Sequence, residues 1–155
     1  MRRETGFTLV ELMVVITIIG ILSATAFTFY RTLQRLSYGK EAVSMMKQIL
    51  NAQIIYFLEN ETFFPSEPDG NAKTYIINHS GQIWPGDEDE INAIRQALNI
   101  TIPVGHFLDF TITGSSIDCQ VNIQSTQQSF PLFKNGDPYL IGRVDRNGKT
   151  DIPLD

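Results

Sequence analysis

The residues with the clearest chemical potential lie near the two ends of the chain. Near the start, Glu11 is the only charged residue in the apolar run from Phe7 to Tyr30. A carboxylate inside a membrane helix costs about 2.5–3.5 kcal/mol on insertion scales, and such charges usually face a partner. We therefore expect Glu11 to bind a cationic group rather than to lie unpaired in apolar surroundings.

Near the other end, Asp145, Asn147 and Asp151 place oxygen donors around a tight turn. Calcium prefers several oxygen ligands, so these residues are candidate ligands for a calcium ion. The spacing lacks the terminal Glu of a full EF-hand loop, however, and Asn147-Gly148 between apolar strands is a strong signal for a two-residue hairpin turn. We favour the hairpin and keep calcium as the alternative.

The remaining reactive residues form no recognisable catalytic or metal motif. His79 and His106 are isolated, and no nucleophile elbow, catalytic carboxylate pair or glycine-rich phosphate loop is present. The one cysteine, Cys119, excludes an intrachain disulfide and a multi-cysteine metal site. A net charge of −5 over 155 residues argues against general binding to a phosphate backbone. We expect no enzymatic activity and no specific nucleic-acid partner.

The apolar run that carries Glu11 is long enough to cross a membrane. Its 24 residues, 7–30, would span about 36 Å as a helix, more than the hydrocarbon core of a bilayer requires. The run is too long for a cleaved secretory signal, and no A-x-A site follows it. A plain signal anchor fits the length but leaves Glu11 unexplained.

The start of the chain also resembles a known family. Gly6 precedes FTLVEL at residues 7–12, and IIGIL follows at residues 18–22; this pattern resembles the N-terminus of type IV prepilins and of type II secretion pseudopilins. The resemblance covers residues 1 to about 65. It implies that a membrane peptidase cleaves between Gly6 and Phe7 and that Phe7 is then N-methylated. It also implies that Glu11 pairs with the amine of Phe7 during assembly, from a neighbouring subunit or from its own chain.

The residues after the apolar run predict that the helix continues. Leu36, Val43, Leu50 and Phe57 repeat every seven residues, which is the period of an amphipathic helix. No proline interrupts residues 7–59, so we expect one long helix that ends shortly before Pro65.

Between this helix and the C-terminal half, we expect a loop and a second helix. Residues 66–86 are rich in turn formers, with one short strand possible at Tyr75–Ile77. A helix then begins at Asp87, which can cap it while Glu90 reaches back as in a capping box.

Alternating apolar residues in the C-terminal half predict an antiparallel sheet. Residues 108–112 and 117–123 read as a hairpin, 139–144 as a third strand and 149–154 as a possible fourth. Cys119 falls on the inward face, so we expect it to be a small buried apolar residue.

These elements predict an α+β fold in which a long N-terminal helix packs on a small antiparallel sheet. We divide the chain into a cleaved leader (1–6), a membrane-spanning and filament-core helix (7–30), an amphipathic continuation (31–61) and a globular head (62–155).

The resemblance implies a structural subunit of a type IV pilus. Such a chain is held in the bacterial inner membrane as a precursor and polymerises through its N-terminal helix into an extracellular filament. Its partners would be other copies or other pilins, the prepilin peptidase and methyltransferase, and the inner-membrane platform and assembly motor. Two alternatives remain open: a type II secretion pseudopilin in a periplasmic pseudopilus, and a membrane-anchored periplasmic binding domain that never polymerises.

Overall fold

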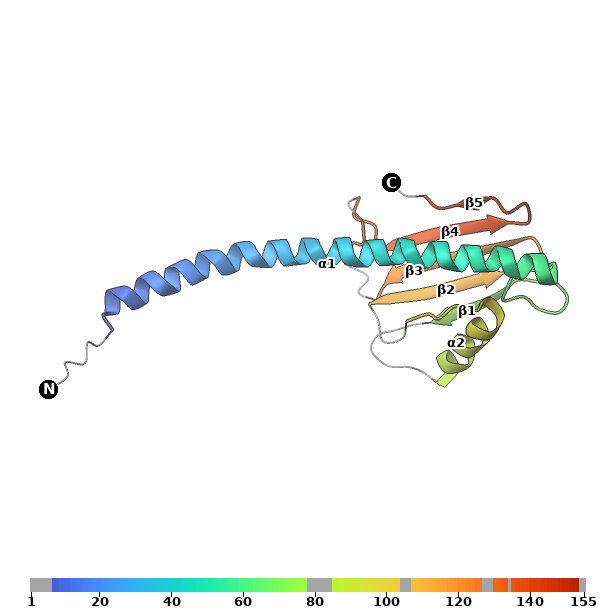
Figure 1. Ribbon diagram of the computed structural model, residues 1–155, viewed down its shortest axis with the longest axis horizontal. Coiled ribbons are helices and arrows are strands. Elements are labelled where there is room, and N and C mark those ends of the chain that lie inside the picture. Colours follow the sequence, from blue (N-terminus) through green and yellow to red (C-terminus); the bar gives the residue numbers. More distant parts are fainter. Residues whose placement is uncertain (1–6, 78–84, 104–106, 127–129, 134, 154–155) are drawn as a thin grey trace. The chain divides into compact units, whose positions relative to one another are not determined.

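The computed structural model describes residues 7–77, 85–103, 107–126, 130–133 and 135–153, without the side chains of 85–87 (Figure 1). The chain divides into two compact units, residues 1–34 and 35–155. The predicted leader 1–6, its Gly6, and both His79 and His106 lie outside the described residues.

Two helices and five strands make up the described chain. The helices are α1 (Leu9–Asn60) and α2 (Pro85–Leu98). The strands are β1 (Lys73–Ile77), β2 (Leu108–Gly114), β3 (Asp118–Ser125), β4 (Tyr139–Asp145) and β5 (Thr150–Asp151). The predicted α+β class is confirmed, with the long apolar N-terminal helix and the small antiparallel sheet as its two components.

Helix α1 ends where the sequence predicts a stop. After Asn60, Glu61 adopts a left-handed conformation with φ of 58°, and its N–H donates to the carbonyl of Phe57 at 2.8 Å. This is a common helix ending, in which a left-handed residue satisfies a carbonyl of the last turn. Pro65 follows and cannot continue a helix.

Within residues 35–155, the second half of α1 covers one face of a five-stranded antiparallel sheet, in which the strands follow chain order (Figure 1). Inward residues of β2 and β3 alternate with half-buried ones, as the period of two predicts. Met46 and Leu50 of α1 are buried in the core that also holds Phe110 and Ile123 of the sheet. Gly142 of β4 allows close packing, because a Cβ atom there would collide with the side chain of Met46.

Strand β5 is shorter than the predicted 149–154. It pairs with β4 only through Thr150 and Asp151, which face Val144 and Arg143. Continuing this register would set Pro153 opposite Ile141, at a position where the ladder needs a backbone N–H. Proline has none, so pairing stops before it.

Helix α2 differs from the prediction at its start. It begins at Pro85 rather than at Asp87, and the Asp87 side chain lies outside the described residues. Glu90 accepts a hydrogen bond from the backbone N–H of Ile76 in β1 at 2.9 Å. The carboxylate that was expected to cap its own helix thus binds a donor on the edge strand of the sheet, and its capping role stays a prediction. The apolar side of α2 is buried and comprises Ile91, Ile94 and Leu98.

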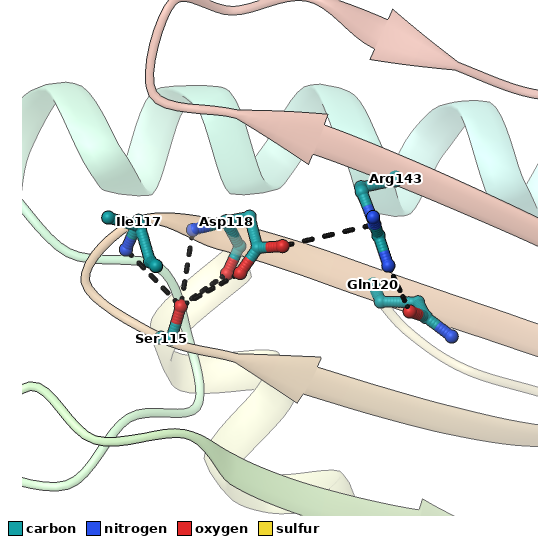
Figure 2. A network of polar contacts seen from close by, with 5 residues as sticks. All are labelled: Ser115, Ile117, Asp118, Gln120 and Arg143. Carbon is teal, nitrogen blue, oxygen red and sulfur yellow. Dashed lines mark hydrogen bonds and ion pairs between the residues drawn. The ribbon is translucent and has the colours of Figure 1, made fainter.

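A polar network fixes the β2–β3 turn and joins it to β4 (Figure 2). The Ser115 hydroxyl lies 2.9 Å from the Asp118 carboxylate and accepts the backbone N–H groups of Ile117 and Asp118, both at 3.2 Å. Arg143 approaches Asp118 at 3.8 Å and donates to the Gln120 side chain at 2.8 Å. The network supports the registration of β2, β3 and β4 on the solvent side of the sheet.

The predicted inward position of Cys119 is confirmed, since its side chain is fully buried. Burial and, to a smaller extent, the neighbouring Asp118 carboxylate together raise the pKa of its thiol to about 12. The thiol is therefore protonated at neutral pH, and Cys119 behaves as a small apolar core residue.

Candidate functional site

The N-terminal unit carries an unusually apolar exposed surface. Its large apolar side chains are exposed by between 43% at Val15 and 79% at Phe7. By length and composition, α1 is able to cross a membrane. Such a surface is stable only in lipid or against other apolar surfaces, so this segment is the first candidate for a functional surface.

Helix α1 begins with a capping box formed by Thr8 and Glu11. The Thr8 backbone N–H and hydroxyl donate to Glu11 Oε2 at 2.9 and 2.8 Å, and the Glu11 N–H donates to the Thr8 hydroxyl at 3.2 Å. Thr8 is the N-cap residue and Glu11 occupies the third helical position, as in the S/T-x-x-E motif. This motif is legible in the sequence, but the prediction considered only a cationic partner for Glu11.

The capping box leaves part of the Glu11 carboxylate available. Both bonds from Thr8 end on Oε2, and within the described part of the chain no donor reaches Oε1. A cation can therefore bind Glu11 without breaking the cap. The structure combines a structural role for this carboxylate with room for an ionic partner.

Two hydroxyl groups inside the apolar part of α1 are satisfied within the helix. The Thr17 hydroxyl donates to the Met13 carbonyl at 2.7 Å, and the Thr25 hydroxyl donates to the Leu22 carbonyl at 2.9 Å. These back-bonds hide the hydroxyl protons from an apolar environment. The segment thus presents hydrocarbon outward, with Glu11 as its one ionised group between Phe7 and Tyr30.

The second candidate site, at the C-terminal turn, is a hairpin with three loop residues. The Asp145 N–H donates to the Lys149 carbonyl at 3.1 Å, and the Gly148 N–H donates to the Asp145 carbonyl at 2.9 Å. Gly148 adopts a left-handed conformation, with φ of 73°, whereas the φ of Asn147 is not positive. The hairpin is therefore present, but the predicted two-residue turn is wrong. A three-residue loop closed by a left-handed glycine replaces it.

The proposed calcium ligands are engaged in this turn. Asp145 Oδ1 accepts the N–H groups of Asn147 at 2.9 Å and Lys149 at 3.0 Å. These bonds hold the pKa of Asp145 below its usual value, and the bond from the Lys149 N–H has the largest effect. Asp151 lies across the strand pair from Arg143. Side-chain and backbone donors account for the turn without an ion, so a calcium site stays a prediction.

No other metal cluster emerges from the described residues, which contain no group of three or more His, Cys, Asp or Glu placed to hold an ion. The functional geometry is therefore concentrated in the capped, apolar N-terminal helix.

Two comparisons bear on this helix. The family described as "Prokaryotic N-terminal methylation motif" matches residues 1–27. The chain is also 41% identical, over 108 residues, to the "Type IV major pilin protein PilA" of Myxococcus xanthus (strain DK1622). That alignment covers 65% of this chain and 46% of the relative, so the chain spans less than half of that relative's length. No solved structure matches the chain. The two matches support the type IV pilin family.

Proposed function

We propose that this chain is a member of the type IV pilin family and a structural subunit of a type IV pilus. It is made as a prepilin in the bacterial inner membrane and then polymerises through its N-terminal helix into an extracellular filament. The observation that carries the proposal is the exposed apolar surface of residues 7–34 within a chain that bears the methylation motif. The match to a major pilin supports the same function.

The proposed processing follows from the motif. The leader 1–6 is removed by cleavage between Gly6 and Phe7, and the new N-terminus of Phe7 is methylated. The partners are the prepilin peptidase and methyltransferase, the inner-membrane platform and assembly motor, and other copies of the chain. The division into leader, core helix (7–30), amphipathic helix (31–61) and head (62–155) is part of this proposal.

The proposed role of Glu11 is to set the register of assembly. The cationic amine of Phe7 from a neighbouring copy binds the carboxylate, and pairing offsets the cost of placing both charges in a medium of low dielectric constant. Access to Oε1 beside the capping box supports this role, because the amine need not displace Thr8.

Mass spectrometry of the mature chain tests the processing. We expect an N-terminal methylated Phe7. An intact Met1, or cleavage near residue 25, would contradict the prepilin assignment. An intact Met1 would favour a membrane-anchored binding domain.

One substitution at Glu11 and one at Thr8 separate the charge from the cap. Glu11→Gln keeps a side-chain acceptor for Thr8 and removes the charge, whereas Thr8→Ala removes the cap and keeps the charge. We expect Glu11→Gln to be processed normally and to form few filaments, with a smaller loss for Thr8→Ala. Filament yields are measured by shearing and electron microscopy, and wild-type yield for Glu11→Gln would refute the ionic role.

The location of the polymer separates the two filament systems. Surface filaments made of this chain, seen by immunogold electron microscopy of intact cells, would support the pilus. A polymer confined to the periplasm, with secretion lost on deletion, would support the pseudopilin alternative.

A further inference from the structure

The side of α1 that faces away from the sheet carries a continuous exposed stripe, which we call the outer stripe. Within residues 35–155, one side of the helix is buried in the core and the opposite side is open. At 3.6 residues per turn the exposed positions, apart from Asn60 at the end of the helix, fall within about 140° of the helix circumference. The outer stripe comprises Leu36, Ser37, Lys40, Ser44, Lys47, Gln48, Asn51, Ile55, Leu58 and Glu59.

The charges of the outer stripe are separated along the helix. Lys40 lies toward its beginning and Lys47 near its middle, whereas Glu59 lies at its end, next to the exposed Glu61. Within the described residues none of these four side chains forms an ion pair. The exposed positions of the stripe are therefore basic toward its beginning and acidic at its end, with the partly buried Glu41 beside Lys40.

Exposed apolar side chains accompany both charged ends. Leu36 is 41% exposed, one turn before Lys40. Ile55 and Leu58 are 60% and 77% exposed and lie beside Glu59. Large aliphatic side chains flanked by unpaired charges are typical of a surface that another protein covers.

We propose that the outer stripe is an interface between two copies of this chain, with the basic end of one copy against the acidic end of another. The proposal rests on the proposed function and adds a second contact to it, in the head. Charge complementarity selects the occupant, because each copy supplies the sign that the other end lacks. Lys40 and Glu59 are about 28 Å apart along the helix, so parallel copies align these ends only when displaced by about this length.

This arrangement is heterologous, since two different patches of each copy are used. Every copy keeps one free basic end and one free acidic end, so the contact repeats into an open filament rather than closing. Parallel copies without displacement would set lysine against lysine, which is repulsive. An antiparallel pair would also match the charges, but it would use up both ends and form a closed dimer.

Charge reversal in the full-length chain tests the pairing. We expect Lys40→Glu and Glu59→Lys each to reduce filament yield severalfold, and the double variant to recover most of it. Lys149→Glu, an exposed reversal in the β4–β5 turn, serves as the matched control and should assemble normally. Wild-type yield for the single reversals, or no recovery in the double variant, would overturn the interface.

Cross-linking keeps the test decisive if a reversal harms folding. The chain with Lys40→Cys and Glu59→Cys should give a ladder of multimers on oxidation of filaments, because Cys119 is buried and does not compete. Dimers alone would support the antiparallel pair and overturn the proposal, as would the absence of cross-links. A wild-type chain without filaments and without methylated Phe7 would instead overturn the proposed pilus function itself.

Discussion

The two parts of α1 use the same kind of residue for opposite purposes. In the first, residues 9–34, isoleucine, leucine and valine side chains are exposed throughout. In the second, residues 35–60, Met46, Ile49 and Leu50 are buried against the sheet, while the opposite side is mostly polar. Apolar content alone therefore does not reveal the role of a helix; the arrangement around its circumference does.

The apolar side chains of the two parts therefore stabilise different states of the protein. Apolar side chains of the second part stabilise the fold of a single chain. Those of the first part gain nothing from that fold and are stabilised only by lipid or by neighbouring copies. Substitutions in the second part should consequently change the free energy of unfolding, whereas substitutions in the first part should change the filament yield.

The largest expected effect comes from a matched pair of leucines. Leu50→Ala leaves a cavity in the core and should lower the free energy of unfolding by about 2–5 kcal/mol. Leu22→Ala lies on the exposed first part, where it should leave unfolding nearly unchanged and reduce filament yield instead. Denaturant unfolding of the full chain in detergent, followed by circular dichroism, measures the free energy of unfolding of both variants. Equal losses of stability would contradict the division of α1 into two roles.

A matched pair of glycines gives the next effect. Gly142→Ala forces a methyl group against Met46 and should cost about 1–3 kcal/mol by overpacking. Gly20 has open space around its Cβ position, so Gly20→Ala should stabilise the helix by up to about 1 kcal/mol. Thermal melts of the full chain distinguish them; a tolerated Gly142→Ala would show that α1 packs less closely on β4 than described.

A smaller effect is expected at the end of the buried part. Glu61→Gly removes the steric cost of a left-handed non-glycine residue and should stabilise the chain by about 1 kcal/mol. Asn99, which ends α2 with φ of 53°, provides the control, because asparagine tolerates this conformation and Asn99→Gly should gain less. A loss of stability in Glu61→Gly would indicate that the Glu61 side chain has a role not seen here.

The smallest effect concerns the Asp145 turn. Hydrogen bonds lower the pKa of Asp145 in the folded chain from 3.8, so its ionised form stabilises folding. This contribution is present above pH 3.8 and is lost as the pH falls through the lower folded-state pKa. Wild type should therefore exceed Asp145→Asn in melting temperature at neutral pH, with the gap closing in acid. A gap that does not depend on pH would exclude this mechanism.

A calcium titration completes the test of that turn. Because Asp145 Oδ1 already accepts two backbone N–H groups, millimolar calcium should leave the melting temperature unchanged. An increase that disappears with a chelator and with Asp151→Asn would establish the calcium site instead.

Much of this fold is predictable from local signals. The periods of seven and two in the sequence give α1 and the hairpins, and the Pro65 stop falls within a few residues of the observed end at Asn60. The details that the sequence did not predict depend on neighbours in space. The local pattern gives Glu90 a capping role in its own helix, but it does not indicate that the fold brings the N–H of Ile76 within reach of this carboxylate.

The candidate site was predicted unevenly for a related reason. The identity of Glu11 as the important charge follows from its apolar context, which the sequence displays directly. Its capping role follows from the Thr8-x-x-Glu11 spacing, which is independent of any external partner. The turn type at Asn147-Gly148 could not be read from the dipeptide, because the strands on either side decide how many residues the loop spans.

The Thr8–Glu11 cap also bears on how a protease reads this chain. Phe7 and Thr8 are not helical, and the cap fixes the first helical residue at Leu9. Peptide bonds in a helix are poor protease substrates, because a cleft must bind extended backbone. Because the cap starts the helix two residues after the proposed scissile bond, that bond stays outside the helix and accessible to cleavage, while the chain beyond it stays folded. The residue pair that orders the start of α1 would thereby also define where the precursor ends and the mature subunit begins.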